Sequence, residues 1–336
     1  MTTTAPAPSP QARGTDPARP TPGARAKQVL TELLPLLVLV ALVLVVSAYQ
    51  PSFLGFRGQR TLFEGAAPII LLALGQMFVI LTGGIDLSLA VQASLGSVLL
   101  ALWLPSLGPG GVALVLVCTF LTGALNGLLT AWAQIPSFIV TLGTMGLWGG
   151  VALWASGASA ISISEGYDAI GWVTDLRIAQ LPVSVLFAVG AAVVIALAMR
   201  YLSRGRLLHA MGLAEQATMM SGTRTAVVRV VAFGLAGLFA GFTAVLLSST
   251  QFAGGPTLAN SLLLPVIAAV VVGGTAITGG VGGPLRTLVG ALVIAVLRVG
   301  MGVVGVDPAF EQIIYGLMIL AAVSLTLDRA RLSVVK

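Results

Sequence analysis

The chain has 336 residues, of which 57% are hydrophobic and only 8% are charged, and its mean hydropathy is +1.04. Soluble domains carry about 25% charged residues, so this composition excludes an ordinary soluble domain and indicates an integral membrane protein. The single cysteine, Cys118, falls in an apolar run, which excludes a disulfide framework and a cysteine metal site. The isoelectric point near 10.2 could indicate nucleic-acid binding, but basic residues gathered between apolar spans are better explained by membrane topology.

Residues 1–28 form a polar segment that is rich in proline, alanine and threonine. A segment of this composition cannot bury enough apolar surface to fold, so it predicts a disordered tail. It also lacks the short charged region and the cleavable apolar stretch of a secretory signal.

Apolar spans fill the remainder of the chain, residues 29–330. Because one crossing needs about 20 apolar residues, the spans predict an all-α polytopic membrane protein with about ten transmembrane helices, some of them short or broken. The spans are 33–49, 66–82, 87–104, 111–133, 136–155, 182–202, 226–249, 261–278, 285–304 and 310–327.

An even number of spans places both termini on one side, and the basic residues then divide unequally. The positive-inside rule therefore predicts cytoplasmic termini, including residues 331–336. Residues 203–225 fall on the same side, whereas residues 156–181, with three acidic residues and one arginine, fall outside. The predicted cytoplasmic side holds Arg13, Arg19, Arg25, Lys27, Arg200, Arg204, Arg206, Arg224, Arg229, Arg286, Arg329, Arg331 and Lys336, and the opposite side holds Arg57, Arg60 and Arg177.

The string "LTGGIDLSLA" (81–90) places a carboxylate, Asp86, directly after an apolar run. The span 66–82 is short for a full crossing and the next span begins at once. The break is therefore predicted at membrane depth, where a broken helix is tolerated only against protein or a water-filled cavity. An ionisable residue at such a place is a functional candidate, with Ser88 as a nearby partner. Asp86 could also cap a helix that begins at Leu87, and the two roles are compatible.

A second glycine cluster, "GGTAITGGVGG" (273–283), closes another short span without an acidic residue. It looks like a phosphate-binding loop but lacks the lysine of the G-x-x-x-x-G-K-[ST] motif. The chain has only two lysines, Lys27 and Lys336, so it contains no such motif and is not expected to hydrolyse ATP by that mechanism.

The loop 203–225 contains "GLAEQATMMSGT" (212–223), which predicts a short helix over 214–220 that stops at Gly222. Its apolar residues Ala217 and Met220 are spaced i, i+3 and share one face. Basic flanks and an apolar face fit a helix on the lipid surface. They fit a docking element for a soluble partner equally well.

Two isolated residues complete the sequence pattern. Arg298 lies deep inside its span and is expected either to extend its charge toward the interface or to pair with Glu311 on the next span. His209 is the only histidine, so no histidine cluster is available for a metal or a catalytic triad.

Several strings, in the same order along residues 30–330, together resemble the membrane permeases of bacterial ABC importers for simple sugars, the ribose-permease type. They are "GGIDLS" (83–88), "NGLLTAWAQIPSFIVTLGTMGLWGG" (126–150), "G…EQA…SG" in the loop 203–225, "GGTAITGGVGG…GALVIAVL" (273–297) and "GVDPAFEQIIYGLMILAAVSLTLDR" (305–329).

The resemblance implies a multi-pass subunit of the bacterial cytoplasmic membrane that pairs with a second permease subunit, identical or homologous, around one path. ATP would be bound by a partner ABC subunit and not by this chain, and solute would come from an extracytoplasmic binding protein. No cofactor, metal or nucleic acid is expected. By resemblance, the helix breaks and path would include Gly83, Gly84, Asp86, Ser88, Asn126, Gly273, Gly274 and Thr275, and the coupling helix Gly212, Glu215, Gln216, Ala217, Met220, Ser221 and Gly222.

The leading hypothesis is therefore a permease subunit for a monosaccharide or a related small polyhydroxylated solute. A related permease for nucleosides or branched-chain amino acids is the near alternative. From another class, a secondary transporter could use Asp86 as its ion or proton site, although proton coupling often uses chains of such residues. A membrane-embedded enzyme would need a catalytic cluster, and the sequence offers none.

Overall fold

The computed structural model describes residues 22–178 and 180–326. The described residues from Pro35 onward belong to one compact unit and those before it to another, and the fold below is that of the described residues in 35–326. Helix α1 (Pro22–Tyr49) begins before the predicted end of the N-terminal tail at residue 28. Residues 1–21 of that tail, and the predicted C-terminal segment 331–336, lie outside the described residues.

The described part of the chain is mostly helical, which confirms the predicted all-α polytopic class. Seven described helices are long and apolar enough to cross a membrane, and three shorter apolar stretches cover 33–49, 260–272 and 311–324, so every predicted span has its helix. The further helices are α2 (Phe56–Leu81), α3 (Leu89–Leu107), α4 (Pro109–Trp132), α5 (Ser137–Ser156), α6 (Asp168–Asp175), α7 (Val183–Tyr201), α8 (Ser203–Leu213), α9 (Glu215–Met220), α10 (Thr225–Gln251), α11 (Leu263–Val272), α12 (Pro284–Val304) and α13 (Glu311–Thr326).

Short elements join these helices. Two two-stranded antiparallel pairs are formed, β1 with β4 and β2 with β3. The strands are β1 (Ile161–Ser162), β2 (Arg177–Ile178), β3 (Leu181–Pro182) and β4 (Ala253–Gly254), and the 3-10 turns are η1 (Pro51–Leu54), η2 (Asn260–Leu262) and η3 (Pro308–Phe310).

The prediction that the span 66–82 is short was wrong. Helix α2 begins at Phe56 and has 26 residues, which is about 39 Å at 1.5 Å per residue and enough for a crossing. Its early turns carry charges that broke the apolar pattern, but Arg60 and Glu64 lie one turn apart and pair at 2.6 Å (Nε to Oε1). The helix break after α2 therefore does not follow from a helix too short to cross.

The bundle is organised around α2 and α10. Most of α2 is buried, and it packs against α10, α12, α11 and α7. Helix α10 packs most extensively against α4, with glycines on both faces. A Cβ at Gly123 would collide with the Phe233 carbonyl, and one at Gly237 with the Thr119 carbonyl. Small residues of this kind allow membrane helices to approach closely, so α4 is held firmly beside the site described below.

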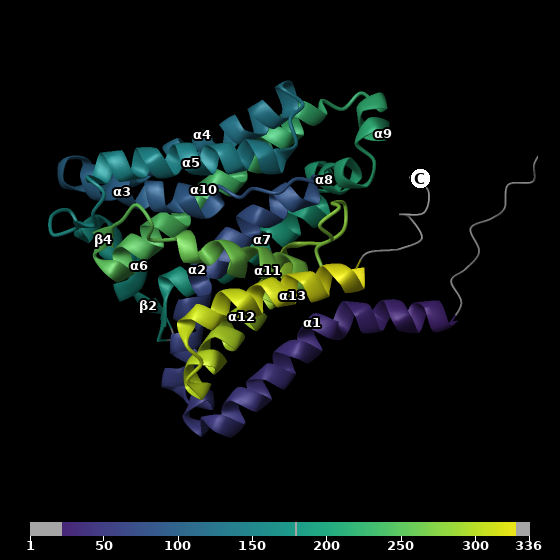
Figure 1. Cartoon of the computed structure of the whole chain (residues 1–336), viewed down its shortest axis with the longest axis horizontal. Helices are drawn as coiled ribbons and strands as arrows, with labels where there is room; N and C mark the ends of the chain where they lie inside the picture. The colour runs from purple at the N-terminus through teal and green to yellow at the C-terminus, as the bar shows by residue number, and fades with distance from the viewer. Residues whose placement is uncertain (1–21, 179, 327–336) are drawn as a thin grey trace, which may run out of the picture. The chain divides into compact units, whose positions relative to one another are not determined.

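Two groups of connecting segments lie at opposite ends of α10 (Figure 1). The α9 end comprises residues 83–85, residues 134–137, α9 and the start of α10, and these segments line one cleft. The β4 end comprises the β1–β4 pair and the segment around β2 and β3. The loops predicted on the same side of the membrane thus gather at the same end of the bundle.

Candidate functional site

Helix α2 ends in a glycine cap that redirects the chain. Gly83 has φ of +79°, its N–H donates to the Ile80 carbonyl at 2.9 Å, and the Gly84 N–H donates to the Val79 carbonyl at 3.1 Å. These two bonds and the left-handed residue define a Schellman motif, which satisfies carbonyls that the helix end leaves free. The first predicted break is therefore a capped helix end with a defined exit direction.

Replacing Gly83 with alanine is expected to lower the unfolding temperature in detergent by about 2–4 °C, since a left-handed residue other than glycine costs about 1–2 kcal/mol. A Cβ at Gly83 would meet only the Thr278 carbonyl at 3.6 Å, so the cost is conformational. Gly146→Ala is the control, because Gly146 lies within α5 with open space around it. Equal behaviour of the two variants in a thermal unfolding assay would contradict the cap.

Asp86 lies at the centre of a fully buried polar network. Its Oδ1 accepts from the Ser88 N–H at 2.8 Å and the Ser88 hydroxyl at 2.6 Å, and its Oδ2 accepts from the side-chain amides of Gln92 (3.3 Å) and Asn126 (3.5 Å). The amide of Gln76, oriented to match its neighbours, donates to the Asp86 carbonyl at 3.1 Å and accepts from its N–H at 3.2 Å. Side chains from α2, α3 and α4 thus converge on this one residue.

The Ser88 hydroxyl connects the same groups a second time. It accepts from both Gln92 and Asn126 at 2.8 Å while donating to Asp86. Asn126 lies six residues before the end of α4 at Trp132, so this network sits about 9 Å inside that end of the helix. The four hydrogen bonds to the carboxylate all come from uncharged donors, which identifies Asp86 as an acceptor that fixes three helices.

The alternative in which Asp86 caps a helix from Leu87 is wrong in its detail. Helix α3 begins at Leu89 with Ser88 as its capping residue. The Ser88 N–H instead donates to the Asp86 side chain, two residues earlier, and this bond closes an Asx turn. Aspartate commonly forms such turns with its own backbone two residues on.

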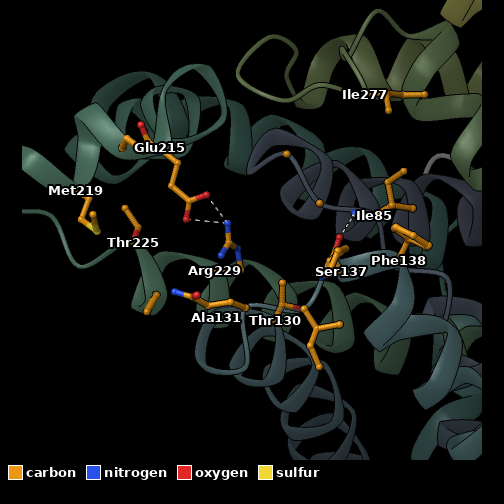
Figure 2. A pocket seen from close by; sticks show the side chains of 17 residues that line it. Ile85, Thr130, Ala131, Ser137, Phe138, Glu215, Met219, Thr225, Arg229 and Ile277 are labelled. Atoms are coloured by element: carbon orange, nitrogen blue, oxygen red, sulfur yellow. Dashed lines mark hydrogen bonds and ion pairs between the residues drawn. The ribbon is translucent and has the colours of Figure 1, made fainter. Parts of the chain in front are cut away.

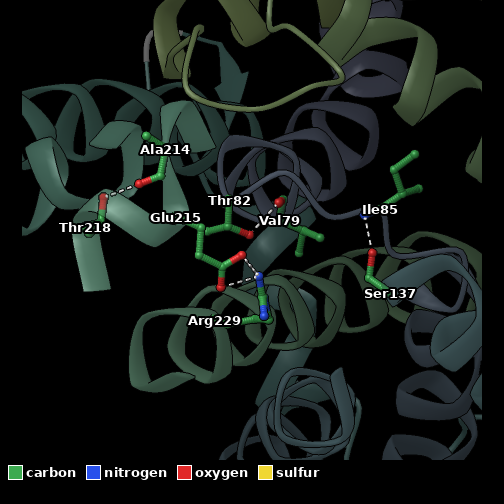
Figure 3. A network of polar contacts seen from close by, with 8 residues as sticks. All are labelled: Val79, Thr82, Ile85, Ser137, Ala214, Glu215, Thr218 and Arg229. Atoms are coloured by element: carbon green, nitrogen blue, oxygen red, sulfur yellow. Dashed lines mark hydrogen bonds and ion pairs between the residues drawn. The ribbon is translucent and has the colours of Figure 1, made fainter. Parts of the chain in front are cut away.

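Helix α5 holds the segment between the glycines and α3. The Ile85 N–H donates to the Ser137 hydroxyl at 3.0 Å (Figure 3), and the Leu87 N–H donates to the Thr141 hydroxyl at 3.1 Å. Ser137 and Thr141 are spaced i, i+4 at the start of α5, so both hydroxyls lie on one face. The sequence analysis did not select these residues, and that spacing is the signal that could have found them.

Replacing Ser137 with alanine is expected to lower stability by about 1 kcal/mol and to loosen the break, since the Ile85 N–H loses its acceptor. Hydrogen–deuterium exchange of the peptide containing Ile85 should rise. Ser106→Ala is the control, because the exposed Ser106 hydroxyl bonds only its own helix at Trp103. Unchanged exchange at Ile85 in the Ser137 variant would show that α5 does not hold the break.

The second glycine cluster repeats the same cap at the end of α11. Gly274 has φ of +90°, its N–H donates to the Val271 carbonyl at 2.9 Å, and the Thr275 N–H donates to the Val270 carbonyl at 3.1 Å. Gly273, which precedes them, is the capping residue of α11. Two Schellman caps therefore end two helices of the bundle at the predicted breaks.

Helix α9 is fixed to α10 through an ion pair. The Arg229 Nη2 donates to both carboxylate oxygens of Glu215, at 2.8 and 2.7 Å (Figure 3). Thr218 faces the protein, whereas Gln216 and Ala217 are exposed and Met220 is 86% exposed. The predicted short helix is present, one residue shorter at its start, and it presents an outward surface.

A cleft of about 750 Å³ lies between α9 and the first break. Figure 2 shows Glu215 and Arg229 on one side of it, and Ile85 and Ser137 on the other. Of the predicted residues, Gly83, Gly84, Glu215 and Gln216 line this cleft. Asp86, Ser88 and Asn126 are buried away from it, and Gly212, Gly273, Gly274, Thr275, Ala217, Met220, Ser221 and Gly222 do not line it.

Two remaining sequence expectations concern charged and metal-binding groups. Arg298 pairs with Glu311, with Nε and Oε2 at 3.8 Å, which confirms the pairing alternative. Within residues 22–178 and 180–326, no three side chains of histidine, cysteine, aspartate or glutamate gather in a way that could hold a metal ion.

Comparison with known proteins matches residues 61–323 to the family described as branched-chain amino acid transport system / permease component. The ribose import permease protein RbsC of Bacillus subtilis is 35% identical over 308 residues, covering 90% of this chain and 94% of that protein. The RbsC of Escherichia coli K12 is 30% identical, with coverage of 88% and 94%. The D-allose transport system permease protein AlsC of E. coli K12 is 27% identical, with coverage of 86% and 89%. No solved structure matches the chain.

Proposed function

The chain belongs to the family of permease components of branched-chain amino acid transport systems, and from this membership we propose that it is the permease subunit of an ABC importer for a sugar. The solute would be a monosaccharide or a related small polyhydroxylated molecule. The observation that carries the proposal is the identity of 35% with a ribose import permease over 90% of the chain. The protein is a multi-pass protein of the bacterial cytoplasmic membrane.

Sugars are favoured over branched-chain amino acids by the individual relatives. The family description names amino acid transport, but two of the relatives above are named for ribose and another for D-allose. The matches cover nearly the full length of both chains, so they include both glycine breaks and α9. Amino acid or nucleoside transport remains the alternative that a transport assay must test.

The α9 end is the cytoplasmic end in this proposal. Arg224 and Arg229 at the start of α10 and Arg204 and Arg206 on α8 give this end its positive charge, in line with the positive-inside rule. Both termini would then be cytoplasmic. The exposed face of α9 is available for an ATP-binding subunit, and the β4 end for an extracytoplasmic solute-binding protein.

In this proposal α9 and the helix breaks have different roles in transport. Helix α9 would receive the movement of the ATP-binding subunit, and the Glu215–Arg229 pair would pass it to α10, which runs the length of the bundle. In this proposal α2 and α11 would turn at their capped ends relative to the other helices of the bundle. A second permease subunit, identical or homologous, would complete the path, which this chain is not expected to form alone.

A secondary transporter with Asp86 as ion site is disfavoured by the network around that residue. Both carboxylate oxygens already accept hydrogen bonds, and Asp86 has no exposed surface. An ion or proton site that works in a transport cycle needs access to solvent from at least one side. The Asp86 side chain is therefore assigned to holding α2, α3 and α4 together.

The test is uptake into proteoliposomes that contain the permease with the ATP-binding subunit and binding protein that copurify with it. Labelled ribose, allose and leucine would be compared, with and without ATP at the face of the ATP-binding subunit, and with a protonophore. We expect accumulation of a sugar that requires ATP and is insensitive to the protonophore. Accumulation of leucine alone, or uptake that follows a proton gradient without ATP, would overturn the proposal.

A further inference from the structure

The last turn of α8 lies against both glycine breaks. A Cβ added at Gly212 would collide with the Leu81 carbonyl, the Gly280 nitrogen and the backbone of Gly279. A Cβ at Gly279 would in turn meet the backbone of Gly83 at 2.7 Å. Three segments far apart in sequence therefore meet backbone to backbone, at a point where side chains would hold them apart.

One peptide segment bonds to its neighbours on both sides at this point. The Gly280 N–H donates to the Leu81 carbonyl at 3.0 Å, which joins the second break to the end of α2. The Gly280 carbonyl lies 3.0 Å from His209 Nδ1. Because a carbonyl only accepts, Nδ1 carries the proton and donates. Gly280 thus connects α8 to α2 through two hydrogen bonds.

Helices α8 and α9 follow each other with only Ala214 between them. Ala214 is extended, with φ of −159° and ψ of 83°, so the chain turns sharply there and gives α9 a new direction. Its carbonyl accepts the Thr218 hydroxyl at 2.9 Å and the Thr218 N–H at 3.0 Å, which ties this corner to α9. A movement of α9 is therefore carried directly to the end of α8.

We propose that His209, Gly212 and Gly280 form a link that carries the movement of α9 to both helix breaks. This proposal rests on the proposed function, since it needs an ATP-binding subunit that moves α9. It gives a role to the only histidine of the chain and to the second glycine string, neither of which the Glu215–Arg229 route to α10 uses. His209 and Gly212 are positioning residues in it and touch no solute.

The readout that separates this role from simple packing is the coupling ratio, the number of solute molecules taken up per ATP hydrolysed. His209→Leu removes the donor to the buried Gly280 carbonyl. We expect this loss of one hydrogen bond to lower the coupling ratio about tenfold. His209→Asn, whose amide can donate to the same carbonyl, should retain most of it. The control is Arg206→Gln, an exposed residue on α8.

A second pair of variants tests the close approach independently of the imidazole. Gly212→Ala should also lower the coupling ratio, since its methyl group would push the two breaks apart. Gly190→Ala in α7 is the matched control, because nothing lies within 4 Å of the added Cβ. Copurification with the ATP-binding subunit and ATPase activity without solute should stay at wild-type levels in all variants that fold.

Hydrogen–deuterium exchange of the wild-type complex tests the link without any substitution. On addition of nucleotide, the segments 79–85, 209–214 and 276–281 are expected to change their exchange together. Change in 209–214 with constant exchange in the other two segments would overturn the link, as would wild-type coupling ratios in both His209→Leu and Gly212→Ala. Failure of wild-type uptake to require ATP would instead overturn the proposed function, so the two failures are distinguishable.

Discussion

Replacing Asp86 with alanine is expected to abolish transport by preventing stable assembly of the bundle. The carboxylate accepts four hydrogen bonds from Ser88, Gln92 and Asn126, all of them buried. Each buried donor left without an acceptor costs about 1–3 kcal/mol, so the variant should lose at least about 3 kcal/mol. The measurement is the yield of monodisperse protein in detergent and its unfolding temperature.

Asp86→Asn gives the more informative comparison, because it keeps the size of the side chain. The remaining oxygen can accept from only one side of the network. The new NH2 group must then face either the amide donors of Gln92 and Asn126 or the N–H and hydroxyl of Ser88. Transport should fall at every pH tested, together with the unfolding temperature. Asp168→Asn, at an exposed position on α6, is the control.

A different outcome for Asp86→Asn would support the competing function. If this variant is as stable as the wild type and loses only uptake driven by a proton gradient, Asp86 is an ion site and not a structural acceptor. Full transport with full stability would show that the network does not hold the helices.

Charge reversal at Glu215 is expected to uncouple ATP hydrolysis from transport while the protein stays folded. Glu215→Arg would place two guanidinium groups at the position of the present ion pair with Arg229, whose side chain is only 18% exposed. The pair adds little to stability, since ion pairs of this exposure contribute about 1 kcal/mol or less. The ion pair instead fixes the position of α9. If the reversal raises the free energy of the coupled position of α9 by about 1.4 kcal/mol, transport should fall at least about tenfold.

The double variant Glu215→Arg with Arg229→Glu restores an opposite pair and should recover much of the coupling. Glu64→Arg is the matched control, because it breaks the ion pair with Arg60 in α2, away from α9. Equal loss in both single reversals would indicate a general effect of charge. Wild-type transport by Glu215→Arg would show that the ion pair has no role in coupling.

The helical spans could be predicted from sequence because apolar runs in a membrane protein are long and uniform. The start of α2 was missed because Arg60 and Glu64 interrupt the apolar run, although their i, i+4 spacing was the signal that the two charges pair on one helix. The glycine clusters predicted two breaks, since a left-handed helix end favours glycine. Their contact through Gly280 is a tertiary feature that no local pattern contains.

The polar network around Asp86 was predicted only in part. Ser88 and Asn126 came from motifs, whereas Gln76 and Gln92 were missed. Both glutamines stand inside apolar runs, where a polar side chain needs a buried partner. That rule would have selected them, but the partner itself depends on how α2, α3 and α4 pack.

The central claim is that this chain is the permease subunit of an ABC importer, and its most direct test is purification of the tagged protein from its native membrane in mild detergent. Mass spectrometry of the copurified proteins should find a stoichiometric ATP-binding subunit with a Walker A motif, together with a second permease chain or a second copy of this one. Purification of this chain without any partner protein, together with transport that needs no ATP after reconstitution, would contradict the claim.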